Sequence, residues 1–182
     1  MAHGFIIESM IQAKNIDALN RSVTSAIDVD GGGLVALAYP TTKGNDVWTA
    51  SAPSTELGGL WIAYNPEVKY TDVNGKRYAG LSADIRDYTN IAGEVFDAFK
   101  PKVGDELIIS IDAVDATGAN AVAGDILESK AGQTKFTRVA AGTGATAGST
   151  AFKIELVDAI DFPSASIGVE KVKAFKAVCI QE

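Results

Sequence analysis

Cysteine and histidine are almost absent from this sequence, which has one of each, Cys179 and His3. A single cysteine cannot form a disulfide within the chain, and the pair falls short of the three or four ligands of a structural zinc site. A Cys-His nucleophile and base would require the two chain ends to meet in a fixed pocket, whereas termini are usually frayed. We therefore expect no metal, no cofactor and no catalytic residue, and we interpret Cys179 as a small apolar residue of the last strand.

Basic residues are outnumbered, because 16 Lys and Arg face 23 Asp and Glu and give a net charge of −7 at pH 7. A surface of that sign repels phosphate backbones and anionic lipid headgroups, so we expect neither nucleic acid nor a membrane as a partner. Residues 1–10 lack the basic stretch and the long apolar run of a signal peptide. The sequence therefore predicts a protein that folds in a reducing cytoplasm.

Helical periodicity is scarce, and strand periodicity is common. Within residues 103–114, Leu107, Ile109 and Ile111 alternate with residues that belong to the opposite face of a strand. Further short strands are expected at residues 23–29, 34–39, 60–64, 136–140, 151–158 and 172–180. The pattern predicts a mainly β fold, a small β-barrel or sandwich with long loops. We expect a single β-rich domain over residues 1–182, with an optional N-terminal arm (1–12) and two subdomains that meet near residue 100.

Turn residues support the β interpretation. Asn74-Gly75 lies between two strand-like segments and predicts a type I′ hairpin, in which both central positions need positive φ. Two Gly-Asp pairs, Gly104-Asp105 and Gly124-Asp125, lie twenty positions apart before strand-like segments. Each predicts a tight turn in which the aspartate side chain accepts hydrogen bonds from the turn backbone.

Two segments are less regular. The Gly-, Ala- and Thr-rich residues 140–150 have little to bury and are expected to form an exposed, mobile loop. Residues 89–99 remain open between one short helix and an irregular docking segment, because their apolar residues fit helical spacing whereas Gly93 weakens a helix.

Four carboxylates lie within fourteen residues of one another, and they are Asp84, Asp87, Glu94 and Asp97. A glycosidase needs two carboxyl groups that face each other across a cleft of fixed width, which the spacing within one segment cannot guarantee. We favour a solvated acidic edge paired with Arg86 and Lys100. We accordingly expect a protein that is not an enzyme.

Aromatic residues concentrate in the first part of the chain, with both tryptophans and eight aromatics in total within residues 48–99. Trp and Tyr build cores, and they also anchor protein interfaces. Sugar stacking is a third use of such side chains. We predict a protein interface from part of this set together with an apolar N-terminal segment. Its residues are Phe5, Ile6, Ile7, Trp48, Trp61, Tyr64, Tyr88, Phe96 and Phe99. The segment Phe5–Ile7 is either an arm that lies over a neighbouring subunit or an ordinary first strand of the barrel.

Four stretches carry a family resemblance: LGGLWIAYNPEVKY from Leu57, YAGLSADIRDYTNIAGEVFDAFKPKVGDELIIS from Tyr78, AVAGDILES from Ala121 and AGQTKFTRVA from Ala131. Together they resemble virion structural proteins of tailed bacteriophages, in particular head decoration or cement proteins. The resemblance implies a non-enzymatic protein on the capsid exterior, assembled in the host cytoplasm, that binds the major capsid protein and locks neighbouring shell subunits together. A homo-oligomer is implied, with a trimer favoured.

Two alternatives remain open from the sequence. One is another virion component, a tail tube or head fibre protein. Tail tube subunits tend to carry a long β-hairpin, for which the Asn74-Gly75 hairpin is the only candidate in the sequence. The other is a carbohydrate-binding module that uses Trp48 and Trp61.

Overall fold

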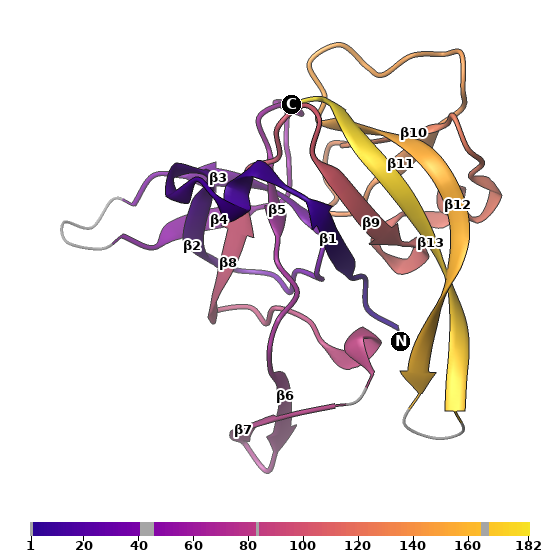
Figure 1. The fold of residues 1–182 in the computed structure, drawn as a ribbon. Helices are drawn as coiled ribbons and strands as arrows, with labels where there is room; N and C mark the ends of the chain where they lie inside the picture. Colours follow the sequence, from indigo (N-terminus) through magenta and orange to yellow (C-terminus); the bar gives the residue numbers. More distant parts are fainter. Residues whose placement is uncertain (1, 41–45, 83, 165–167) are drawn as a thin grey trace.

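The computed structural model describes residues 2–40, 46–82, 84–164 and 168–182, and it confirms a mainly β fold that contains a small barrel (Figure 1). One antiparallel sheet has the strand order β1 (Ile6–Met10), β9 (Glu106–Ser110), β13 (Gly168–Gln181), β12 (Ala151–Ser164), β10 (Ile126–Glu128) and β11 (Thr137–Val139). The closed barrel has the order β2 (Asn20–Ser25), β4 (Trp48–Ser51), β3 (Leu34–Ala38), β5 (Trp61–Ala63) and β8 (Val95–Phe99). A separate hairpin consists of β6 (Lys69–Val73) and β7 (Lys76–Gly80). The helical segments of the described residues are short 3-10 turns, η1 (Gln12–Lys14), η2 (Asp17–Leu19), η3 (Ile85–Asp87), η4 (Ile111–Ala113) and η5 (Ala116–Asn120).

The barrel and the six-stranded sheet share one core. Successive residues of a strand point to opposite faces, so β3 places Val35 inside the barrel and Leu34 on its outer face. The outward set, which includes Leu34 and Phe99, packs in a single cluster with Ile109 and Phe175 of the sheet. The chain passes from barrel to sheet after β8, between residues 99 and 106. No helix within the described ranges is long and apolar enough to cross a membrane.

The predicted turns are confirmed. Asn74 and Gly75 have φ values of 51° and 72°, the positive values that a type I′ turn requires. The two Gly-Asp turns resemble each other, because each aspartate accepts a hydrogen bond from the backbone N–H three positions before it. Asp105 Oδ2 accepts the backbone N–H of Lys102 at 2.8 Å, and Asp125 Oδ2 accepts that of Val122 at 2.9 Å. Each turn then docks on the long β12–β13 hairpin, because the glycine N–H groups donate to the carbonyls of Cys179 and Ile154.

Residues 89–99 contain no helix, so the helical interpretation of this segment is wrong. Residues 95–99 form β8, which pairs with β2 on one side and β5 on the other. Gly93 has a φ of 82° and lies in the turn that leads into this strand. Phe96 and Ala98 pack inside the barrel and Phe99 packs in the shared core, whereas Val95 and Asp97 on the outward face of β8 are exposed.

The end of the Gly-rich segment 140–150 is anchored. The carboxylate of Glu128 accepts hydrogen bonds from the Thr146 backbone N–H at 2.7 Å and the Thr146 hydroxyl at 2.8 Å. Ser149 and Thr150 are fully buried. The expectation of an exposed loop therefore applies to residues 140–148 and not to the last two.

The N-terminal segment forms the edge strand β1 of the six-stranded sheet, where it pairs with β9. Phe5 and Ile6 are buried in the interior of their own chain. Along the other edge of β1, the side chain of Asn65 accepts from the Ile6 N–H at 3.0 Å and donates to the Ile6 carbonyl at 2.5 Å. His3, which we expected near a frayed terminus, pairs with Asp30 at 2.7 Å. The segment is thus fixed along both edges.

Candidate functional site

The predicted interface residues do not lie on one surface. Five of them are buried within the chain, namely Phe5, Ile6, Tyr88, Phe96 and Phe99. Ile7 is 36% exposed on β1, and Tyr64 is half-buried. Trp48 and Trp61 are also half-buried, and they come together at one end of the barrel.

Trp48 and Trp61 belong to a group that we call the barrel-end cluster, formed with Arg21 and Tyr39. Arg21 pairs with Ala98 across β2 and β8, so it points to the inner side of the barrel wall. Its guanidinium carbon lies over both indole rings, 5.5 Å from each centroid. The Tyr39 ring meets Trp48 edge-on at a centroid distance of 5.0 Å and is 74% exposed.

The barrel-end cluster has the side chains that dominate the energetics of protein interfaces, which are Trp, Tyr and Arg. Each contact of Arg21 with an indole is a cation–π interaction that also fixes the orientation of the ring. Because Arg21 covers one face of each indole, that face is not open for stacking of a sugar ring. The aromatic composition of the sequence identified the two tryptophans as candidates. Arg21 and Tyr39 could not be identified in this way, because they contact the tryptophans only once the barrel is closed.

A second feature is a cavity of about 510 Å³ between the β6–β7 hairpin and the barrel, which we call the hairpin cleft. Its lining comprises residues 8, 64–68, 70, 89–91 and 94–97. The lining has four carboxylates and two tyrosines but no Lys, Arg or His. Burial raises the pKa of Tyr64 to about 12, with further contributions from the nearby charges of Glu8 and Asp97. The lining therefore has four acidic side chains and no basic one.

Three of the four cleft carboxylates have a partner outside the lining. Glu8 pairs with Lys14 at 3.1 Å, and Glu94 pairs with Arg77 at 2.8 Å. Asp97 accepts a hydrogen bond from the Ser22 hydroxyl at 2.8 Å. The fourth, Glu67, is exposed and has no such partner within the described residues.

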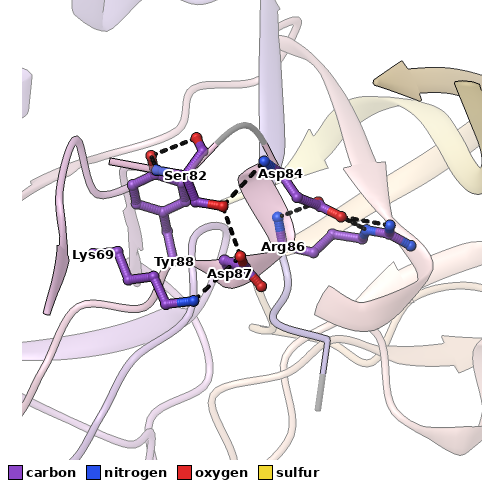
Figure 2. Close-up of polar contacts among 6 residues, drawn as sticks. All are labelled: Lys69, Ser82, Asp84, Arg86, Asp87 and Tyr88. Atoms are coloured by element: carbon purple, nitrogen blue, oxygen red, sulfur yellow. Dashed lines mark hydrogen bonds and ion pairs between the residues drawn. The ribbon is translucent and has the colours of Figure 1, made fainter. Parts of the chain in front are cut away.

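A polar network next to the cleft holds the segment that returns from the hairpin to the barrel (Figure 2). The Ser82 N–H donates to the Tyr88 hydroxyl at 2.6 Å, and this hydroxyl donates to the Ser82 carbonyl at 2.8 Å. The Ser82 hydroxyl donates to Asp87, which also pairs with Lys69 of β6 at 3.2 Å. Tyr88 is thus a structural residue, and Lys69 links the network to the first strand of the hairpin.

The predicted pairing of the acidic edge with Arg86 is confirmed, whereas the Lys100 side chain forms no ion pair within the described residues. Arg86 donates to both carboxylate oxygens of Asp84, and these hydrogen bonds hold the pKa of Asp84 below its ordinary value. The hydroxyl of Ser82 and the ammonium group of Lys69 likewise lower the pKa of Asp87. Within the part of the chain that the structure describes, no three His, Cys, Asp or Glu side chains are grouped as metal ligands.

The fold and these two features define a β-barrel joined to an antiparallel sheet, with an aromatic and arginine surface at the barrel end and an acidic cleft beneath a hairpin. No protein-family model, curated protein or solved structure matches the chain.

Proposed function

We propose that this protein is a capsid decoration protein, which binds the major capsid protein on the outer surface of a phage head and stabilises the shell without catalysis or a cofactor. The observation that carries the proposal is the barrel-end cluster, because an exposed tyrosine next to an arginine held between two tryptophans is typical of the centre of a binding surface. The sequence resemblance supplies the identity of the partner.

The proposed mechanism is stabilisation by mass action. A protein that binds the assembled shell and not its dissociated subunits adds its binding free energy to the stability of the shell. The net charge of −7 suits the exterior of a particle whose interior is filled with DNA. We propose that the protein acts there as a homo-oligomer, with a trimer favoured.

The test is to mix the purified protein with undecorated capsids and to measure the bound protein after sedimentation. Tyr39→Ala removes the most accessible ring of the barrel-end cluster, and we expect capsid affinity to fall by roughly tenfold or more. Tyr78→Ala is the matched control, because Tyr78 is 54% exposed on the separate β6–β7 hairpin. Equal binding of both variants and the parent protein would exclude the barrel-end cluster as the capsid contact.

A tail tube or head fibre protein is a second candidate, favoured by the β12–β13 hairpin. The sequence suggested the hairpin at residues 74–75 as the only candidate for a long hairpin, and this expectation was wrong. The strands of β12 and β13 have 14 residues each, against 5 each in β6 and β7. The β9 strand pairs with β13 only at residues 174–178, and β10 pairs with β12 only at 151–153. The remainder of the hairpin extends away from the sheet (Figure 1).

This second candidate requires self-assembly. A tail tube or fibre subunit polymerises with copies of itself, whereas a decoration protein binds to a preformed shell. Electron microscopy of the concentrated protein without capsids separates the two. Tubes or fibres in such samples would favour the second candidate, and dispersed particles that bind capsids would favour decoration.

A further inference from the structure

The hairpin cleft has the size and lining of a small-molecule site. Its volume of about 510 Å³ falls within the range of about 300–1,000 Å³ that is usual for ligand pockets. Tyr64 and Tyr70 belong to its wall. The Tyr64 ring packs against Phe99 at a centroid distance of 4.8 Å, and the Arg77 guanidinium carbon lies over one face of the Tyr70 ring, 5.9 Å from its centroid. Neither the barrel-end cluster nor the proposed capsid contact uses this space.

Three side-chain donors of the cleft are already used within the protein, whereas the buried Thr89 hydroxyl and the Tyr70 hydroxyl have no hydrogen-bond partner among the described residues. The Asn65 amide N–H₂ donates to the Ile6 carbonyl, and the Asn90 amide N–H₂ donates to the Tyr64 carbonyl at 3.1 Å. The Tyr64 hydroxyl donates to the Asn20 side chain at 2.9 Å.

The groups that remain are mostly acceptors. Glu67 has no partner within the described residues. Glu8, Glu94 and Asp97 each use one carboxylate oxygen in the contacts described above, which leaves the second oxygen of each. A ligand that fits the cleft must therefore bring several donor groups of its own.

Charge and geometry narrow the class of ligand. An anionic ligand is disfavoured because the lining has four carboxylates and no basic side chain. A metal ion is disfavoured because the carboxylates of the described residues do not converge on a common point. A ligand with an ammonium or guanidinium group is disfavoured because two of the four carboxylates are already paired with Lys14 and Arg77. Dispersed acceptors and aromatic walls instead suit an uncharged molecule with many hydroxyl groups.

We propose that the hairpin cleft binds one or two rings of a neutral oligosaccharide, with a C–H face of the sugar against the face of the Tyr70 ring opposite Arg77 and its hydroxyl groups donating to Glu67 and Asp97. This site is distinct from Trp48 and Trp61, and the proposal does not depend on capsid binding.

The experiment is a calorimetric titration of the purified full chain with maltohexaose, cellohexaose, mannohexaose and chitohexaose, with hexagalacturonate as an anionic counterpart and oligolysine as a cationic one. Two variants test the site, Tyr70→Ala and Glu67→Lys. The matched control is Tyr78→Ala, because the β6–β7 register places Tyr70 and Tyr78 on opposite faces of the same hairpin. Thermal unfolding of each variant reports whether the fold is retained, and the exposed position of Glu67 makes the second variant informative even if the first unfolds.

We expect at least one neutral hexasaccharide to bind, hexagalacturonate not to bind, and both site variants to weaken binding by roughly tenfold. Tyr78→Ala should bind as the parent does, and added NaCl should have little effect because the ligand is uncharged. The proposal is overturned if no neutral sugar binds, or if folded Glu67→Lys binds as tightly as the parent. It is also overturned if binding is confined to a cationic probe, oligolysine, and is lost in salt.

Discussion

Asp125 offers a quantitative test of how the Gly-Asp turns stabilise this fold. Its side chain is 1% exposed, and its carboxylate accepts the backbone N–H groups of Val122 at 2.9 Å and Ala141 at 2.8 Å. Arg138 Nε donates to the same carboxylate at 2.5 Å. Asp125→Ala leaves these donors without an acceptor, and each unsatisfied buried donor costs about 1–3 kcal/mol. We expect a total loss of about 3–5 kcal/mol, which lowers the Tm of a protein of this size by roughly 10 °C.

The pH dependence of the same variant gives a second measurement. Burial alone would raise the pKa of Asp125, but hydrogen bonds from Arg138 and from the two backbone N–H groups hold it below its ordinary value. A carboxyl group with a lower pKa in the folded state stabilises the fold above its unfolded pKa of about 3.9, and this contribution is lost as the pH falls through the folded pKa. The difference in Tm between the parent and Asp125→Ala should therefore shrink below about pH 4.

Differential scanning calorimetry from pH 7 to pH 3 measures both effects. Asp17→Ala is the control, because Asp17 is exposed and its side chain has no partner within the described residues. We expect it to change the free energy of unfolding by less than about 0.5 kcal/mol. The reasoning is refuted if Asp125→Ala unfolds within about 2 °C of this control at neutral pH, since a loss of 3–5 kcal/mol cannot give so small a shift.

Three further predictions address other parts of the chain. Deletion of residues 2–10 removes the buried side chains Phe5 and Ile6, each worth about 1.5–3 kcal/mol, and should unfold the protein; a folded truncation with unchanged Tm by circular dichroism would contradict this. The Cys179 thiol is 1% exposed and burial raises its pKa to about 12, so it should react with a chromogenic disulfide reagent in guanidinium but not in native buffer; fast native labelling would contradict its burial. Gly31→Ala would place a Cβ 2.2 Å from Asn65 Oδ1 and should lower the Tm by several degrees, whereas the control Gly80→Ala meets its nearest atom at 4.0 Å and should not.

The parts of the fold that the sequence predicted are those with local causes. Asn74-Gly75 defines its hairpin because two consecutive residues must adopt positive φ. The Gly-Asp turns at 104–105 and 124–125 are set by hydrogen bonds between residues three positions apart. The pairing of β1 with β9 joins residues about 100 positions apart, such as Ile6 and Ile109, and no local pattern specifies it.

The β8 strand was missed because its apolar residues do not alternate strictly with polar ones. A strand with one buried face alternates between apolar and polar residues. In β8 this alternation is broken by an exposed apolar residue, Val95, and by two consecutive buried ones, Ala98 and Phe99. Phe96 and Ala98 pack inside the barrel, and Phe99 packs against the sheet, so the segment carries apolar residues at spacings that also fit a helix.

The candidate sites were predicted only in part. The concentration of aromatics identified Trp48 and Trp61, but the neighbouring Arg21 comes from another strand, which the barrel brings alongside them. The hairpin cleft combines residues 8, 64–68, 70, 89–91 and 94–97, which are separated in sequence and meet only after the hairpin folds over the barrel. The carboxylates at 94 and 97 were noted as an acidic edge, and nothing in their spacing indicated a cavity.

The order of strands in the six-stranded sheet has a consequence for biosynthesis. The β13 strand lies between β9 and β12, and β1 lies beyond β9, so β1 has no neighbour in its sheet until residue 106 and beyond have been translated. The barrel strands, all within residues 20–99, are complete much earlier. We therefore expect the barrel to fold cotranslationally while β1 is still unpaired. The six-stranded sheet can form completely only after β13 has been translated.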